Sequence, residues 1–134
     1  MASNRATVEE LIRLMNQRDE RPTHLTHPDI EWHWAPSTPG PSVYRGHEEL
    51  HEGLDAWVES WDQLVIEPVE LYEDGDYVLA LTRYRMRGAG SGVHLEETVA
   101  HLHQFTEDGL LRRWWMFGDA EKAKRRFLAG DRPA

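Results

Sequence analysis

The sequence predicts a single α+β domain in which a curved, mostly antiparallel sheet wraps around helices near the N-terminus. In the first half, apolar residues recur at helical spacing in two segments. The second half holds strand-like runs separated by short glycine-containing turns, which typically join antiparallel neighbours. A chain of 134 residues with 40% hydrophobic residues can bury one sizeable core. We expect one domain over residues 1–134, with an ordered core at about 7–129.

Two helices and one strand are expected in the first half. Thr7 and Glu10 match a capping box, and apolar residues at helical spacing follow, which predicts a helix over residues 8–17. Alternation in 29-DIEWHW-34 predicts a half-buried strand. After a proline-rich loop, residues 47–61 form an amphipathic helix with one apolar stripe: Leu50, Leu54, Trp57, Val58 and Trp61.

Four strands and a last helix are expected in the second half. Asp119 is placed to cap the helix, and Gly130 is placed to end it. Residues 77–81 and 99–105, in two of the expected strands, are largely apolar on both faces. The helices can cover only one face of the sheet, so we expect a homodimer across the other face. The strand-like runs are residues 64–73, 77–87, 93–106 and 110–117.

The charge balance disfavours two classes of partner. The chain has 15 basic and 24 acidic residues, a net charge of −9, which repels nucleic acid phosphates and anionic lipid. No apolar run approaches the length of a membrane span, and residues 1–20 lack the apolar core of a signal peptide. Cysteine is absent, which excludes thiol catalysis and disulfides. We expect a cytoplasmic protein that binds neither nucleic acid nor membrane.

The stretch 47-HEELH-51 matches the His-Glu-x-x-His pattern of many zinc hydrolases. Two histidines one helical turn apart can bind one ion, but a site of this kind needs a third ligand. Gly46 places the pattern at the frayed start of a helix, and Glu48 points away from the apolar stripe. Glu70, the candidate third ligand, lies on an interrupted strand. We therefore predict no metal and interpret the motif as helix surface.

Taken together, five segments resemble the nuclear transport factor 2-like superfamily in its SnoaL-like, polyketide cyclase-like branch. The resemblance implies a cone-shaped, cystatin-like sheet with an apolar pocket inside, frequent dimerisation and no cofactor. Relatives include polyketide cyclases, ketosteroid isomerase, epoxide hydrolases and pocket proteins without catalysis, so the fold does not fix the activity. The segments are 27-HPDIEW-32, 44-YRGHEEL-50, 88-GAGSGV-93, 99-VAHLHQFTEDG-109 and 113-RWWMFGD-119.

Three side chains are the candidate catalytic residues. If residues 87 and 93 flank the GAGSG turn, Arg83 pairs with Glu97, and His101 faces the same side of the sheet as Glu97. His101 also matches the position where ketosteroid isomerase carries the protonated acid of its oxyanion hole. A histidine in an apolar pocket beside a carboxylate can exchange protons near neutrality. The alternative is an inter-strand salt bridge beside a hydrogen-bonded core histidine.

The remaining pocket residues are mostly aromatic. The resemblance puts Trp34, Met116 and Val99 where relatives carry catalytic acids or an arginine, so their known constellations are missing here. What remains suits a flat, apolar or polycyclic molecule. We expect either an isomerase, cyclase or dehydratase using His101, or a non-catalytic ligand-binding protein, or a dimeric module whose tryptophans fill the cavity. The expected ligand-binding residues are Trp32, Trp34, Trp57, Leu81, Val99, His103, Trp114 and Met116.

Overall fold

The computed structural model describes residues 3–17, 21–33, 43–59, 61–88, 90 and 92–133. It confirms the α+β class. Six strands form one sheet in the order β2-β1-β6-β5-β4-β3. Neighbouring strands are antiparallel except β1 and β6, which are parallel. The elements are α1 (Asn4–Met15), η1 (Thr23–Leu25), β1 (Thr26–His33), β2 (Val43–Arg45), α2 (Gly46–Glu59), β3 (Trp61–Asp74), β4 (Tyr77–Gly88), β5 (His94–Phe105), β6 (Leu111–Phe117) and α3 (Ala120–Leu128).

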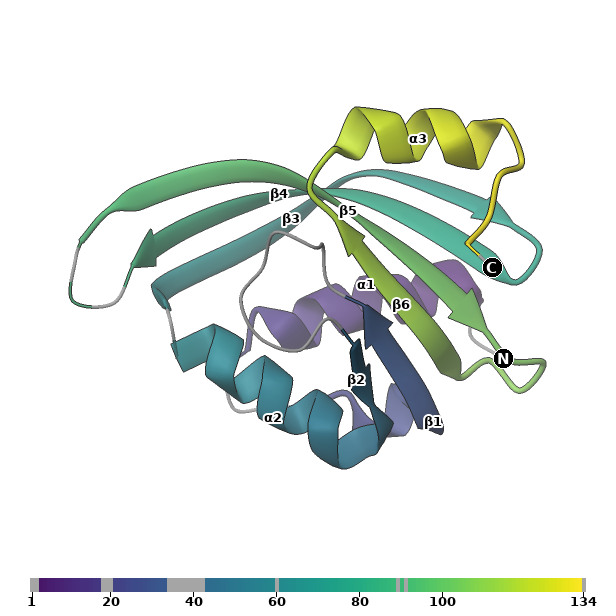
Figure 1. Cartoon of the computed structure of the whole chain (residues 1–134), viewed down its shortest axis with the longest axis horizontal. Coiled ribbons are helices and arrows are strands. Elements are labelled where there is room, and N and C mark those ends of the chain that lie inside the picture. Colours follow the sequence, from purple (N-terminus) through teal and green to yellow (C-terminus); the bar gives the residue numbers. More distant parts are fainter. Residues whose placement is uncertain are drawn as a thin grey trace.

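The sheet is strongly curved, and the helices lie on both of its faces. Figure 1 shows α1 and α2 on the concave side, with α3 lying across the outer side. Alternation along β4 and β5 sends successive side chains to opposite faces, so the sheet serves two cores. The inner cluster includes Ile30, Trp32, Tyr84 and Trp114, packed with α1 residues such as Leu11.

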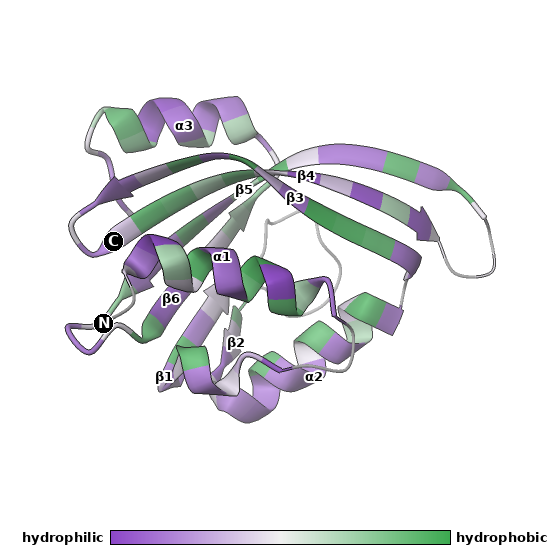
Figure 2. Ribbon diagram, turned by 180° about the vertical axis from the view of Figure 1, so that it is seen from behind, coloured by the Kyte–Doolittle hydropathy of each residue, from purple (hydrophilic) through white to green (hydrophobic). Residues whose placement is uncertain are grey.

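The outer cluster explains why both faces of the central strands are apolar. It contains Leu79, Leu81, Ala100, Leu102 and Trp115 from the sheet together with Ala120 and Phe127 from α3. Figure 2 shows that α3 consists mostly of hydrophilic residues, and Ala120 and Phe127 are its buried positions. The second face is therefore covered by the chain's own last helix, which removes the reason for which we expected a dimer. The homodimer stays a prediction.

Two expected helix boundaries are wrong. Ser3, rather than Thr7, caps α1, because its hydroxyl oxygen accepts a hydrogen bond from the backbone N–H of Ala6 at 3.1 Å. Glu10 instead pairs with Arg13, at 2.9 Å from Oε2 to Nε. The helix over 47–61 ends early, and Trp61 begins β3. No helix of the described residues is long and apolar enough to cross a membrane.

Candidate functional site

The register between β4 and β5 differs by one residue from the predicted register. Gly88 remains in its strand and donates its N–H to the Val93 carbonyl at 2.9 Å, so Gly88, not Arg87, flanks the turn. Every pair shifts accordingly, and Tyr84, rather than Arg83, lies opposite Glu97. Since neighbours across a ladder share a face, this shift exchanges the β4 residues that face the interior.

The predicted catalytic group of Arg83, Glu97 and His101 therefore does not form. The Arg83 side chain is 46% exposed and pairs with Glu96, with 3.4 Å between Nε and Oε1. Glu97 is exposed as well. Leu81, expected in the pocket, lies in the outer cluster. Arg83 and Leu81 are displaced for the same reason, because odd-numbered β4 residues face away from the interior.

The prediction that His101 faces inward is confirmed, since its side chain is fully buried. Its ring has two hydrogen-bonding partners. Nε2 shares a hydrogen bond with the hydroxyl of Tyr84. The indole Nε1–H of Trp114 donates to Nδ1 across 3.3 Å. Sequence reasoning missed Tyr84 because the assumed register turned it outward.

The tryptophan determines where the histidine carries its proton. An indole N–H can only donate, so Nδ1 of His101 must present its lone pair. Burial lowers the pKa of His101 well below its ordinary value, and the neighbouring His103 lowers it further, so the ring is neutral. A neutral ring with a free Nδ1 carries its proton on Nε2, and that N–H donates to the Tyr84 oxygen. The Tyr84 proton is then left for another acceptor.

Tyr84 keeps its proton at neutral pH. The side chain is 2% exposed, and this burial raises the pKa of its phenol well above the ordinary value. Trp57 of α2 covers it, with ring centroids 5.7 Å apart at an interplanar angle of 52°. The site thus holds an uncharged hydroxyl donor under an aromatic cover.

His103, two residues along β5, has one unused nitrogen. Its Nδ1 donates to the Val78 carbonyl at 3.0 Å, which leaves the lone pair on Nε2. That Nε2 atom is buried and has no hydrogen-bond partner among the described residues. Burial lowers the pKa of His103 to about 4. The neutral ring stacks on Trp114, with centroids 6.1 Å apart.

The other expected ligand-binding residues form the wall around this chain of hydrogen bonds. Trp32 stacks on Trp114 at 5.0 Å between centroids, and its Nε1–H donates to the sulfur of Met116 at 3.0 Å. Val99 is 9% exposed and belongs to the same inner cluster. Trp34 lies outside the described residues. A role of these residues in ligand binding stays a prediction.

Little free volume is present beside the aromatic cover. A pocket of about 30 Å³ lies between α1 and α2, and Trp57, Leu54 and His51 contribute to its lining. This is room for about one water molecule. The pocket does not reach Tyr84, which lies on the other side of the Trp57 contact.

The two histidines of the zinc-like motif are engaged with protein partners. His47 Nε2 lies 3.1 Å from the Thr26 carbonyl oxygen, and His51 Nε2 lies 2.9 Å from the Thr23 hydroxyl. Both contacts fasten α2 to the segment that leads into β1. Within the described ranges, no group of three or more His, Cys, Asp or Glu side chains could hold a metal ion.

Comparison with known proteins supplies the family. The model of the SnoaL-like domain matches residues 8–114. The chain belongs to the SnoaL-like domain family. No curated protein was found to match this SnoaL-like chain.

Solved structures share the fold of this SnoaL-like domain. A nuclear transport factor 2-like protein of unknown function from Burkholderia pseudomallei aligns with a TM-score of 0.78 and 21% identity, over 93% of this chain and 97% of that one. TerC, co-crystallised with polyporic acid, aligns with a TM-score of 0.75 and 19% identity, over 91% and 95%. A protein of Jannaschia named as a candidate SnoaL-like polyketide cyclase aligns with a TM-score of 0.75 and 15% identity, over 90% of this chain and 88% of that one. Identities this low show the fold alone.

Proposed function

We propose that this SnoaL-like protein binds a small, flat, largely apolar molecule inside the cone and performs acid–base chemistry on it without a cofactor. The substrate carries a carbonyl or phenol oxygen, and the reaction is an isomerisation, cyclisation or dehydration. One observation carries the proposal: the hydrogen bonds from Trp114 to His101 and between His101 and Tyr84 leave the Tyr84 proton free for a ligand.

Tyr84 takes the role that the sequence suggested for His101. Its hydroxyl proton is donated to the carbonyl oxygen of the ligand, where negative charge develops as the ligand enolises. His101 is a positioning residue in this scheme, since its Nε2–H donates to the Tyr84 oxygen and stabilises charge on it. The surrounding inner cluster excludes water, which strengthens both hydrogen bonds.

His103 is the candidate base. Its Nε2 lone pair is buried and has no partner in the described part of the chain, and the imidazole centroids of His101 and His103 are 6.0 Å apart. A ligand that accepts a proton from Tyr84 can therefore present a C–H or O–H to His103. A ring with a pKa of about 4 is a weak base, but it is unprotonated and available at neutral pH.

Solved neighbours support the choice of ligand class. TerC was crystallised with polyporic acid, and another neighbour is the epoxide hydrolase/cyclase-like enzyme SalBIII, which acts in pyran ring formation in salinomycin. Trp32 and Trp114 are flat apolar side chains of the kind that such ligands contact, and both are fully buried in the inner cluster. We therefore place the ligand against these rings, with its oxygen toward Tyr84.

A non-catalytic ligand-binding protein is the second candidate. Val99 and Met116, where the resemblance implies an arginine and an acid in catalytic relatives, are both apolar and buried. The Met116 sulfur is also engaged by the Trp32 indole. On this alternative, Tyr84 orients a ligand but no proton is transferred.

Titration calorimetry with polyporic acid, 2-naphthol and 1-tetralone tests the binding proposal. We expect saturable binding of at least one of the three, weakened roughly tenfold by Tyr84→Phe, which deletes only the donor. Tyr77→Phe is the matched control, because Tyr77 lies on the same strand but packs against the outer cluster. Failure of all three to bind, or equal loss in both variants, would contradict the proposal.

Hydrogen–deuterium exchange at the α-carbon of bound 1-tetralone separates the two candidates. An acid–base site accelerates the exchange in D₂O, as followed by proton NMR, and Tyr84→Phe and His103→Phe each abolish the acceleration. Binding without acceleration favours the non-catalytic candidate.

A further inference from the structure

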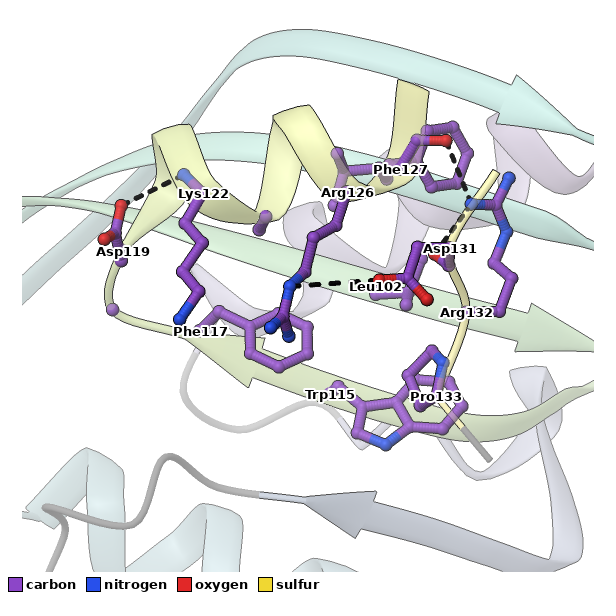
Figure 3. A pocket seen from close by; sticks show the side chains of 13 residues that line it. Leu102, Trp115, Phe117, Asp119, Lys122, Arg126, Phe127, Asp131, Arg132 and Pro133 are labelled. Atoms are coloured by element: carbon purple, nitrogen blue, oxygen red, sulfur yellow. Dashed lines mark hydrogen bonds and ion pairs between the residues drawn. The ribbon is translucent and has the colours of Figure 1, made fainter. Parts of the chain in front are cut away.

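A second pocket lies on the outer face of the sheet, beneath α3 (Figure 3). It has a volume of about 390 Å³, within the range of small-molecule sites. The sheet separates it from the interior: Trp115 and Leu102 line it, whereas their chain neighbours Trp114 and His101 face inward. The pocket is thus a different site from the one proposed above.

The inner surface of this pocket is apolar and partly aromatic. Leu79, Leu102, Trp115 and Phe117 form its floor on the sheet, and Phe127 of α3 contributes from above. Trp115 is only 7% exposed and Leu79 only 1%. A ligand of about two fused rings would fit in such a space and contact these side chains with its flat faces.

The chain following α3 forms a fixed end wall. Arg132 donates to the Phe127 carbonyl at 3.0 Å and pairs with Asp74 at 2.6 Å. Its guanidinium also lies over the Phe127 ring, 4.0 Å from the centroid. These contacts hold Pro133 beside Trp115, as Figure 3 shows. The wall is built by specific interactions and does not depend on a ligand.

Two cations extend over the floor from one face of α3. Figure 3 shows the Lys122 and Arg126 side chains both running toward Phe117. The Lys122 ammonium has no ion pair among the described residues, and Asp119 contacts this residue only at its backbone, where Oδ1 accepts the Lys122 N–H at 3.0 Å. Among the described residues, the ion pair of Arg126 is a loose, exposed contact with Asp131, at 3.9 Å.

This arrangement of charge is unfavourable for the helix itself. Like charges one turn apart repel, and a cation in the first turn opposes the helix dipole. Lys122 has both disadvantages, although the chain as a whole is acidic, with a net charge of −9. An anion bridging Lys122 and Arg126 would offset both the repulsion between the two cations and the unfavourable interaction of Lys122 with the helix dipole.

We propose that the pocket binds a small organic carboxylate with a flat apolar body. The body lies between Trp115, Phe117 and Phe127, and the carboxylate lies between Lys122 and Arg126. Neither cation needs to move far, since both side chains already extend over the pocket.

Calorimetry with 2-naphthoate tests the site, with 2-naphthalenemethanol as its uncharged counterpart. We expect saturable binding of 2-naphthoate and at least tenfold weaker binding of the alcohol. The double variant Lys122→Gln/Arg126→Gln should lower the naphthoate affinity at least tenfold and leave that of the alcohol unchanged. Absence of naphthoate binding, or equal affinity for acid and alcohol, would overturn the proposal.

Two matched variants locate the bound probe. Arg125→Gln removes one cation from α3 without touching the pocket lining, so it should have less effect than Lys122→Gln. Tyr84→Phe alters the interior and should leave naphthoate binding unchanged. A loss with Tyr84→Phe and none with the double variant would place the probe inside the cone and refute the outer site. Circular dichroism confirms that each variant folds.

Discussion

The indole N–H of Trp114 lies 3.3 Å from Nδ1 of His101 and thereby determines which nitrogen of the buried ring is protonated. Both residues are fully buried, which keeps bulk water away from this hydrogen bond. The consequence extends to Tyr84, whose proton is free only because His101 already donates to its oxygen. One buried contact on β6 thus controls the donor on β4.

Replacing Trp114 should change both the stability of the protein and the protonation of His101. Trp114→Phe leaves Nδ1 of His101 without a donor, and an unsatisfied buried acceptor costs about 1–3 kcal/mol. The lost indole volume adds to this. We expect urea denaturation to show this loss of stability, and His101 to adopt the opposite tautomer in part. An unchanged tautomer would show that Trp114 does not set it.

Stability should fall as the pH drops below neutrality. Folded His103 has its pKa lowered to about 4 from 6.5, so between these values the unfolded chain binds a proton that the folded chain does not. The unfolded state is then favoured by about 1.4 kcal/mol per pH unit for such a histidine. His101, with its pKa lowered in the same direction, acts likewise.

Urea unfolding at pH 7.5, 6 and 5 measures this dependence. His103→Phe should reduce the slope by about one proton over that range. His24→Gln is the control, because His24 is an exposed histidine outside the buried site. A flat profile in the unmodified protein would contradict the buried, neutral state of both rings.

Asn16 should contribute to the attachment of α1 to the sheet. Its amide donates to the Ile66 carbonyl at 2.9 Å and accepts from the Ile66 N–H at 2.8 Å. Asn16→Ala removes both hydrogen bonds, and we expect a loss of about 1–2 kcal/mol by urea denaturation. Asn16→Asp keeps the acceptor and should have an intermediate effect. Equal stability of all three proteins would show that water replaces the amide.

Zinc should not bind stoichiometrically at the HEELH motif. Both Nε2 atoms are engaged, by Thr26 for His47 and by Thr23 for His51. We expect no change in melting temperature on adding one equivalent of Zn²⁺ to protein lacking a histidine tag. A rise that disappears in His51→Ala would contradict this expectation.

Alternation was sufficient to predict much of the fold and the inward direction of His101. It failed at register, because GAGSG contains several glycines that can each end the strand, and only the Gly88–Val93 hydrogen bond decides among them. Because the register differs by one residue, Tyr84 faces the interior where the sequence predicted Arg83. The cover of α3 over Leu79 and Trp115 was also missed, since periodicity along one element does not say which face of a sheet it meets.

The protonation state of His101 tests the account most directly. Long-range proton–nitrogen NMR at pH 7.5 distinguishes the two tautomers and the imidazolium form. We expect the proton of His101 on Nε2 and that of His103 on Nδ1, opposite tautomers two residues apart on one strand. A proton on Nδ1 of His101, or a doubly protonated ring, would leave Tyr84 without a free donor and would contradict the proposed site.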